Sequence, residues 1–328
     1  MNTADRWRPS GTIQALRTRA TLLAAARSFF SARNVLEVET PILCANGITD
    51  TWVESFHIAK ANLWLRTSPE YHMKRLLASG SGDIYQIGKA FRAGESGSRH
   101  QPEFTLVEWY RTGFTLDEML KETCQFIIEL SSYGAKPLAG FDTLYYSEIF
   151  QDLTGLNPLS ASTRELRDCA RKLPSWDDSL LHHLGAEKSG WLDLIASHAV
   201  YPALPSGRLQ VIRDYPAEQA LLARLNPDDP ATAERFEVFL NGVELANGFR
   251  ELLDADEQLE RFKADNVQRG ECSLPLVQPD EHLIAALREG LPDCSGVAVG
   301  LDRVLMTTDA HARIDDTVSF TVDLNSGY

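Results

Sequence analysis

The stretch from residue 84 to residue 110 holds the residue types best suited to chemistry. Its sequence, IYQIGKAFRAGESGSRHQPEFTLVEWY, predicts two strands joined by a polar loop that carries Arg92, Arg99 and His100. Gly94 and Gly97 would let this loop turn tightly, because glycine adopts backbone conformations that other residues avoid. Arginines at the end of a hairpin are suited to a nucleotide, because the planar guanidinium binds phosphate oxygens well.

The returning strand of this hairpin adds aromatic and carboxylate groups. Side chains alternate along a strand, so every second residue shares one face. One face therefore combines an aromatic ring, a carboxylate and a phenol, contributed by Phe104, Leu106, Glu108 and Tyr110. We interpret this combination as a site for a nucleotide beside a small cationic molecule. An ordinary hairpin with surface charges is the alternative.

Helices and strands with recognisable boundaries must position this hairpin. Apolar residues at helical spacing predict a helix over residues 13–33, and the alternating run VLEVET before Pro41 predicts a short strand. Residues 64–77 begin as a strand and turn at SPEYH into a helix. Thr115 and Glu118 have the spacing of a capping box, for a helix that ends near Gly134.

The second half of the chain predicts helices followed by another hairpin. Residues 146–204 are mostly helical, residues 209–215 return to strand, and Asn241-Gly242 between two alternating runs indicates a hairpin turn. We expect helices after Asp254 and over residues 280–288, then the segment SGVAVGLDRVLM and a closing strand, VSFTVDL. No repeat or linker divides the chain. We therefore expect one α+β domain over residues 1–328.

Composition excludes several classes of protein. The 328 residues carry 32 Lys and Arg against 46 Asp and Glu, a net charge of −14, which makes RNA a poor default partner although a local basic surface could still exist. The five cysteines contain no C-x-x-C pair, which argues against a zinc ribbon or a disulfide framework. No signal peptide opens the sequence and no apolar run approaches the roughly 18 residues of a membrane span. We expect a cytoplasmic protein that does not bind membranes.

Three separated segments resemble the three motifs of class II aminoacyl-tRNA synthetases. They are FFSARNVLEVETPIL (29–43), the hairpin at 84–110, and GVAVGLDRVLM (296–306), with TSPEYHMKRLL and ELANGFREL between them. The similarity is greatest to lysyl-tRNA synthetases and runs from about Thr12 to the C-terminus. It implies a mainly antiparallel sheet flanked by helices. It also implies a homodimer, because motif one builds the dimer interface in that class.

The chain is shorter than those synthetases. Only about a dozen residues precede the first expected helix, too few for an anticodon-binding OB domain. It therefore resembles the truncated paralogues that use ATP to ligate (R)-β-lysine to a lysine of translation elongation factor P. This resemblance implies ATP and Mg²⁺, elongation factor P as the acceptor, and tRNA as an unlikely partner. Two alternatives remain open, a free-standing enzyme that charges a tRNA and a non-catalytic regulatory subunit.

The resemblance also implies roles for individual residues. Arg92, Arg303 and Glu244 would carry catalysis, and Glu244 and Glu251 would bind the metal. The expected nucleotide contacts are Arg92, Ala93, Gly94, Glu95, His100, Gln101, Phe104, Glu244, Leu245, Gly300 and Arg303. The expected substrate contacts are Ser68, Pro69, Glu70, Glu108, Tyr110, Asn247, Glu251 and Ala298.

Three positions depart from the family pattern. Gly94 stands where motif two usually carries the glutamate that reads adenine, so either Glu95 reaches the base by a changed loop path or backbone groups replace the contact. Gln101 stands where the family commonly has asparagine. Ala298 replaces a glycine of lysyl-tRNA synthetases, and one added methyl group can shift the choice between close substrates by roughly 1–3 kcal/mol. We predict that Ala298 disfavours α-lysine relative to β-lysine.

Overall fold

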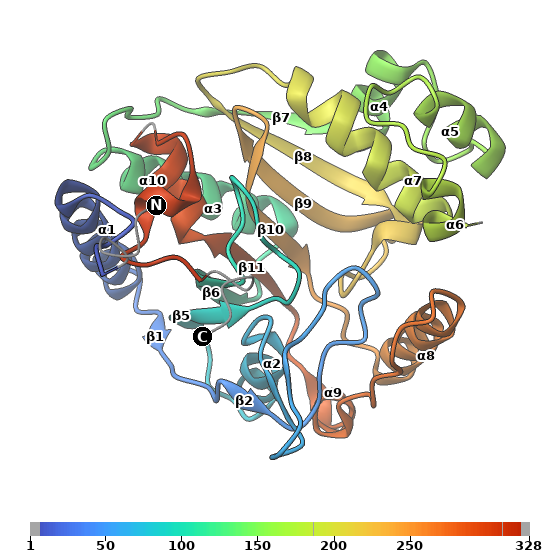
Figure 1. Ribbon diagram of the computed structural model, residues 1–328. Helices are drawn as coiled ribbons and strands as arrows, with labels where there is room; N and C mark the ends of the chain where they lie inside the picture. Colours follow the sequence, from blue (N-terminus) through green and yellow to red (C-terminus); the bar gives the residue numbers. More distant parts are fainter. Residues whose placement is uncertain (1–6, 186, 310, 323–328) are drawn as a thin grey trace.

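The computed structural model describes residues 7–185, 187–309 and 311–322. Within them, one large sheet forms the centre of the molecule, and helices cover both of its faces (Figure 1). In spatial order its strands are β1 (Leu36–Glu37), β5 (Ile84–Phe91), β6 (Glu103–Thr112), β11 (Cys294–Gly300), β10 (Val243–Arg250), β9 (Thr232–Leu240), β8 (Leu209–Pro216) and β7 (Phe141–Tyr145). A small separate sheet contains β2 (Leu43–Cys44), β4 (Leu63–Leu65) and β3 (His57–Ile58).

The strands of the large sheet are mainly antiparallel, and only the outermost pairs, β1 with β5 and β7 with β8, are parallel. The helices are α1 (Ile13–Ser31), α2 (Glu70–Ala78), α3 (Leu116–Ser131), α4 (Tyr146–Thr154), α5 (Thr163–Ala170), α6 (Leu180–Leu184), α7 (Lys188–Ile195), α8 (Ala255–Glu271), α9 (Glu281–Gly290) and α10 (Leu301–Thr308). Alternating, mostly antiparallel strands with flanking helices confirm the predicted α+β class.

Short-range signals in the sequence are confirmed at several boundaries. Thr115 and Glu118 form the expected reciprocal capping box of α3. Asn241 and Gly242 connect β9 to β10 with positive φ angles of 53° and 72°, which a two-residue hairpin turn requires. The side chain of Asp254 accepts hydrogen bonds from two backbone amides at the start of α8.

Two predicted strands are wrong in extent. The run VLEVET pairs with β5 only over Leu36–Glu37, because both the amide and the hydroxyl of Thr40 donate to the side chain of Gln86 instead of to a ladder. Residues 318–322 of VSFTVDL form no strand. The carbonyls of Val318 and Ser319 instead accept hydrogen bonds from the backbone amides of Gly11 and Ser10. The last two residues of that run lie outside the described part of the chain.

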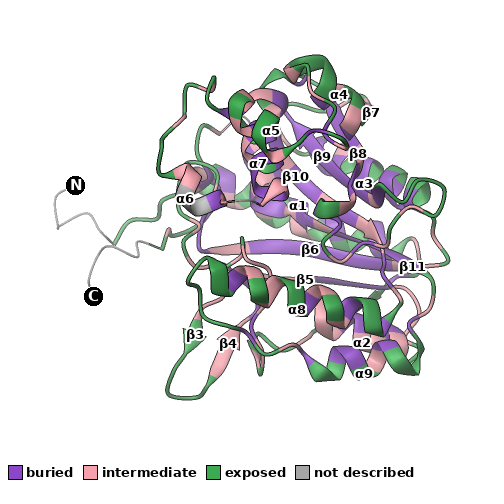
Figure 2. Ribbon diagram, turned by 90° about the vertical axis from the view of Figure 1, so that its right-hand side faces the viewer, coloured by how far each residue is buried: buried purple, intermediate pink, exposed green. Residues whose placement is uncertain are grey.

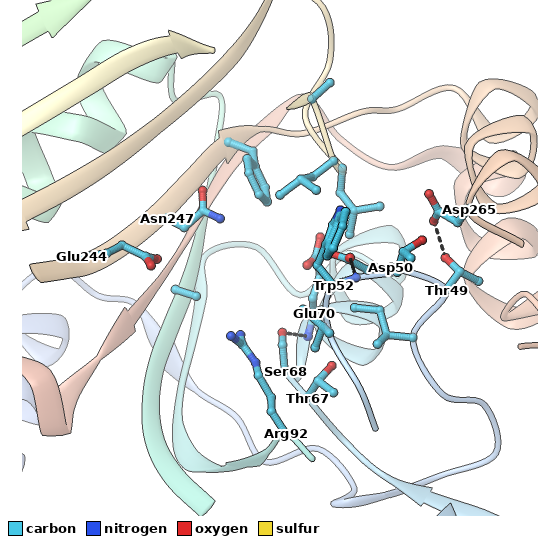
Figure 3. A pocket seen from close by; sticks show the side chains of 18 of the residues that line it. Thr49, Asp50, Trp52, Thr67, Ser68, Glu70, Arg92, Glu244, Asn247 and Asp265 are labelled. Atoms are coloured by element: carbon cyan, nitrogen blue, oxygen red, sulfur yellow. Dashed lines mark hydrogen bonds between the residues drawn. The ribbon is translucent and has the colours of Figure 1, made fainter. Parts of the chain in front are cut away.

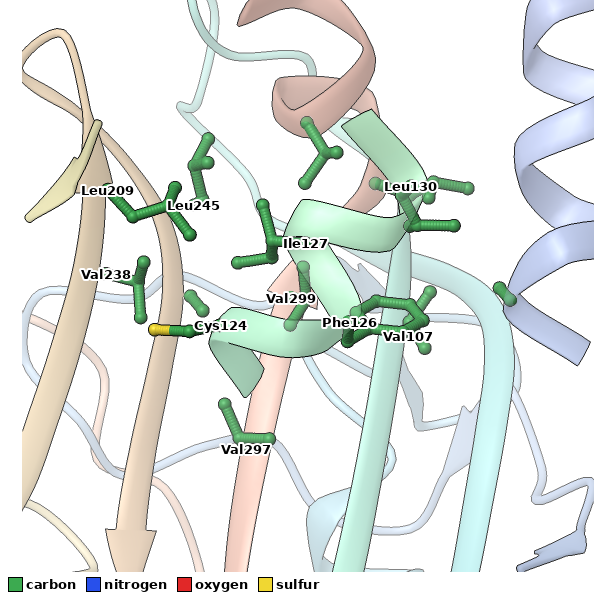
Figure 4. Packing of buried hydrophobic residues seen from close by; sticks show 14 of the residues in the cluster. Val107, Cys124, Phe126, Ile127, Leu130, Leu209, Val238, Leu245, Val297 and Val299 are labelled. Carbon is green, nitrogen blue, oxygen red and sulfur yellow. The ribbon is translucent and has the colours of Figure 1, made fainter. Parts of the chain in front are cut away.

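The main hydrophobic core lies between one face of the large sheet and helices α1, α3 and α10. Figure 4 shows α3 lying across the sheet, with Phe126 and Ile127 beside Val107 and Val299. A second core packs α4, α5 and α7 against β8 and β9, at the end of the sheet far from β1 (Figure 1). A third core packs α2, α8 and α9 together beside β5 and β6 (Figure 2). The sheet face that α3 leaves uncovered holds the candidate site.

Candidate active site

A pocket with a cavity of about 620 Å³ opens on the sheet face opposite α3. Its floor comes from β6, β10 and β11, and its walls come from the loop at residues 48–53, the start of α2 and the inner side of α8 (Figure 3). Strand alternation divides β6 as predicted. Phe104, Leu106, Glu108 and Tyr110 line the pocket, whereas Val107 and Trp109 are buried in the core.

The end of the pocket that we call the arginine end comprises Arg92, Glu95, His100, Glu244 and Arg303. Arg92 leaves the end of β5, and its Nη1 lies 3.3 Å from Oε1 of Glu95. Its guanidinium carbon lies 5.1 Å from the ring centre of Phe104. A planar cation and an aromatic ring therefore occupy adjacent positions.

Arg303 is held on the other side of the arginine end. It lies in the first turn of α10, where its Nη1 donates to the backbone oxygen of Glu244 at 3.0 Å and to the carboxylate of Glu244 at 3.2 Å. Its Nε donates to the carbonyl of Arg99 at 3.3 Å. Burial and the nearby charge of Arg303 lower the pKa of His100, which favours a neutral imidazole at neutral pH.

The opposite end, the carboxylate end, comprises Ser68, Glu70, Glu108, Tyr110 and Glu251. Glu108 is only 2% exposed and accepts hydrogen bonds from Ser68 Oγ at 2.8 Å and from the Tyr110 hydroxyl at 2.9 Å. Burial, and then the nearby Glu70 carboxylate, raise the pKa of Glu108 to about 8. Burial raises the pKa of Glu251 to about 7, although Lys74 opposes the shift.

Close approach to a glycine fixes the geometry of the carboxylate end. A Cβ atom at Gly296 would lie 2.4 Å from Cε1 of Tyr110 and 2.5 Å from Oε1 of Glu251. Both distances are shorter than van der Waals contact, so only glycine leaves room for these two side chains. The phenol and the carboxylate can therefore pack directly on β11.

The floor between the two ends carries an amide and a methyl group. Asn247 accepts a hydrogen bond on Oδ1 from Nε of Arg235 at 3.2 Å, which leaves its amino group turned toward the pocket (Figure 3). Ala298 lies between Asn247 on β10 and Glu108 on β6 in the strand register. Its methyl group is therefore part of the floor, beside both predicted substrate contacts.

Most of the residues expected at the site line this pocket, and three do not. Pro69, Ala93 and Gly94 lie outside the lining. The amide of Ala93 donates to the carbonyl of Glu54 at 2.8 Å, so it is already engaged in loop structure. Gly94 has a φ of +79°, a conformation that glycine adopts without strain.

Two further expected nucleotide contacts have other structural roles. The side-chain amide of Gln101 donates to Asp315 at 2.8 Å and accepts from the backbone of Val322, so it connects the loop to the C-terminal segment. The side chain of Leu245 is buried in the main core (Figure 4). Any contact that Leu245 makes in the pocket must therefore come from its backbone.

Sequence reasoning missed one wall and one buried cation. The wall joins the loop residues Thr49, Asp50 and Trp52 to the inner face of α8, where Thr49 donates to Asp265 at 2.6 Å (Figure 3). The i, i+3 and i+7 spacing of Gln258, Arg261 and Asp265 was the available signal for this face. The cation is Lys74, one helical turn after Glu70, and that i, i+4 spacing was visible in the sequence.

Other classes of site have little support. Within the described ranges, no three His, Cys, Asp or Glu side chains gather as a metal site. No helix in the part of the chain that the structure describes is long and apolar enough to cross a membrane. All five cysteines are free thiols.

Comparison with known proteins defines the class. The family model described as "tRNA synthetases class II (D, K and N)" matches residues 3–323, so the chain belongs to the class II tRNA synthetase family.

Relatives within this family carry a more specific name. A protein of Haemophilus influenzae (strain PittGG) named elongation factor P–(R)-β-lysine ligase is 42% identical over 331 residues, which cover 98% of this chain and 99% of that protein. A protein of Yersinia pestis (strain Pestoides F) with the same name is 41% identical over 332 residues, covering 99% of this chain and all of that protein.

Proposed function

We propose that this protein is an ATP-dependent ligase that activates (R)-β-lysine as its adenylate and transfers it to the ε-amino group of a lysine on elongation factor P. The observation that carries the proposal is the division of one pocket into an arginine end and a carboxylate end. The names of relatives that match over nearly the whole chain support the choice of substrate and acceptor. The net charge of −14 is consistent with an acceptor other than tRNA.

In the first step, a substrate carboxylate oxygen bonds to the α-phosphorus of ATP, and the bond to pyrophosphate breaks. Arg92 would lie between the two anions and offset their repulsion with its planar guanidinium. Phe104 would stack on adenine, a contact worth about 1–3 kcal/mol per base. Arg303 would cover the other face of the base and hold the γ-phosphate, with neutral His100 donating to a phosphate oxygen.

In the second step, the acceptor ε-amine bonds to the carbonyl carbon of the adenylate. AMP leaves with the bridging oxygen, and the amine loses a proton. No nucleophilic side chain is needed, because the adenylate is already activated and the protein acts by positioning and electrostatics. Glu70, Glu108 and Glu251 would bind the two ammonium groups of (R)-β-lysine, with Asn247 donating to its carboxylate. The methyl group of Ala298 would disfavour α-lysine.

For Mg²⁺, the two expected ligands differ in how well they fit. Glu244 presents a carboxylate that is 40% exposed at the arginine end, where its Oε2 pairs with Nη1 of Arg303 at 3.2 Å. This exposed pair can open when Arg303 turns to the phosphates, which would leave Glu244 free to hold an ion beside them. When bound there, Mg²⁺ offsets phosphate charge and stabilises the departing pyrophosphate. Glu251 fits poorly, because the ammonium of Lys74 lies 2.6 Å from its Oε2 and would repel a divalent cation. We therefore assign Glu244 to the metal and Glu251 to the amino acid.

Further expectations from the family remain part of this proposal. They are a homodimer built through the motif-one segment at residues 29–43, one catalytic domain over residues 1–328, and a cytoplasmic location without membrane partners.

Pyrophosphate exchange with (R)-β-lysine, α-lysine and other amino acids tests the activation step. We expect exchange to be fastest with (R)-β-lysine, and transfer of the labelled amino acid to elongation factor P. Exchange with none of the amino acids would exclude activation, and transfer to tRNA alone would favour the free-standing synthetase.

A further inference from the structure

A fully buried lysine lies directly behind the carboxylate end of the pocket. Lys74 on α2 is 1% exposed, and its Nζ lies 2.7 Å from Oε1 of Glu70 and 2.6 Å from Oε2 of Glu251. Both carboxylates line the pocket, whereas Lys74 does not. Its ammonium therefore binds the carboxylates from the protein side and leaves their other side for a ligand.

The third carboxylate of this end has only neutral donors among its hydrogen bonds. Glu108 accepts from the hydroxyls of Ser68 and Tyr110, and Lys74 forms its two ion pairs with the other two carboxylates. When ionised, three carboxylates with one ammonium leave an excess of two negative charges. A substrate with two ammonium groups matches that excess.

Among the described residues, the remaining titratable groups near this cluster form no ion pair with its carboxylates, although the charge of Arg66 acts on Glu108. Burial raises the pKa values of Tyr110 and Cys294, so both are neutral at pH 7. The Nε of Arg66 donates to the carbonyl of Lys89, and its Nη1 donates to the carbonyl and the hydroxyl of Thr40, each at 2.9 Å. Lys74 is thus the ammonium that pairs with these carboxylates.

We propose that Lys74 is a positioning residue that sets the charge of the carboxylate end and thereby its selectivity for amino acids with two ammonium groups. Its ammonium fixes the orientation of Glu70 and Glu251 and compensates one of the three buried negative charges. Without it, the three carboxylates would repel one another, and burial would favour their protonation. The inference rests on the proposed function, because it assumes that an amino acid occupies this end.

The experiment compares Lys74→Met, Glu70→Gln and the double variant Lys74→Met/Glu70→Gln. The double variant lacks the same substrate carboxylate as Glu70→Gln but restores the excess of two negative charges. KM is measured by pyrophosphate exchange with (R)-β-lysine and with 3-aminohexanoic acid, which lacks the ε-ammonium group, from pH 6 to pH 8.5. The control is Lys263→Met, which removes an exposed lysine that lies 2.7 Å from Glu260 on α8. We expect this control to match the wild type in KM and melting temperature.

For Lys74→Met we expect the KM for (R)-β-lysine to rise more than tenfold at pH 7, whereas the KM for ATP should stay within about twofold. Because loss of the ammonium raises the pKa values of the carboxylates, the pH dependence of the amino-acid KM should move to higher pH. The double variant should bind (R)-β-lysine more tightly than Glu70→Gln and prefer it more strongly over 3-aminohexanoic acid. A purely structural lysine would instead change stability without moving the pH profile.

Several outcomes would overturn the inference. One is a folded Lys74→Met variant with the wild-type KM and pH profile. If that variant does not fold, the double variant and Glu70→Gln decide, because both lack the same substrate carboxylate. A double variant that does not fold, or that binds (R)-β-lysine no more tightly than Glu70→Gln, would show that charge balance is not the role of Lys74. Failure of the wild type to catalyse exchange with any diammonium amino acid would overturn the proposed function instead.

Discussion

The arginine end and the carboxylate end of the pocket expose their charged groups to very different degrees. The side chains of Arg92 and Glu95 are each 29% exposed, and that of Arg303 is 20% exposed. The side chains of Lys74 and Glu251 are each 1% exposed. Partly exposed ion pairs contribute only about 0–1 kcal/mol, so those of the arginine end can exchange partners when a polyphosphate binds. Buried pairs are costly to break, so the carboxylate end keeps its geometry.

Under the proposed function, this difference would separate two tasks within one cavity. At the arginine end, Arg92 and Arg303 are each paired with a carboxylate, and binding of ATP would replace that partner by phosphate. At the carboxylate end, the groups proposed to select the amino acid already contact one another, Ser68 and the backbone at Gly296. If the proposed function is right, the chemistry would depend on groups that can rearrange, and the selection of the amino acid on groups that cannot.

The largest effect is expected from Arg92→Ala. It removes the cation assigned to the reacting carboxylate and the α-phosphate, and loss of one such donor typically lowers kcat about 10²–10³-fold. We expect pyrophosphate exchange to fall by that factor while the melting temperature stays within about 2 °C, because the Arg92–Glu95 pair is partly exposed. The exchange rate of Arg92→Lys, which keeps the charge but not the planar guanidinium, should lie between those of the wild type and the alanine variant. A loss of less than tenfold for the alanine variant would remove Arg92 from the chemical step.

A matched pair of glycine substitutions contrasts the two ends directly. Gly296→Ala would press its methyl group against Tyr110 and Glu251, so we expect destabilisation of about 1–3 kcal/mol and a large rise in the KM for the amino acid. At Gly300 the nearest atom, Cδ of Arg303, would lie 3.8 Å from the new Cβ, so Gly300→Ala should fold normally and raise only the KM for ATP. Thermal melting and exchange kinetics measure both. Equal melting temperatures for the two variants would contradict the prediction that the carboxylate end is rigid.

The pH dependence of binding should also differ between the ends. Because burial raises the pKa of Glu108 to about 8 and that of Glu251 to about 7, both are largely protonated at pH 6 in the free protein. A diammonium substrate requires the ionised forms, so binding releases protons, and KM should fall about tenfold per pH unit for each proton released. Titration calorimetry in buffers of different ionisation enthalpy measures how many protons are released when the substrate binds. A KM for (R)-β-lysine that is constant from pH 6 to pH 8 would contradict this prediction.

The smallest effect is expected from Glu95→Ala. If Glu95 replaces the adenine-reading glutamate that is missing at Gly94, its removal should raise the KM for ATP about three- to tenfold and leave the amino-acid KM unchanged. Glu103→Ala is the control, because Glu103 pairs with Lys89 on the surface and lies outside the pocket lining. Unchanged ATP affinity in Glu95→Ala would favour recognition of adenine by backbone groups.

Local patterns in the sequence predicted the elements whose boundaries are encoded by near neighbours. The capping box at Thr115, the turn at Asn241 and the shared face of Phe104 and Glu108 follow from contacts or alternation within a few residues. The predicted length of a strand was wrong where a residue distant in the sequence determines its end. The strand before Pro41 ends early because Thr40 bonds to Gln86, a contact that no local pattern encodes.

The sequence by itself determined the α+β class, and strand alternation correctly placed Phe104, Leu106, Glu108 and Tyr110 on the face that lines the pocket, because alternation is a local property of the chain. Only the tertiary structure showed that Lys74 lies behind Glu70 and Glu251, that Ala93 is engaged by Glu54, and that α8 forms a wall of the pocket. The physical reason is that burial and charge pairing depend on which surfaces pack together. Residues far apart in the sequence therefore set the pKa values and the exposure that distinguish the two ends.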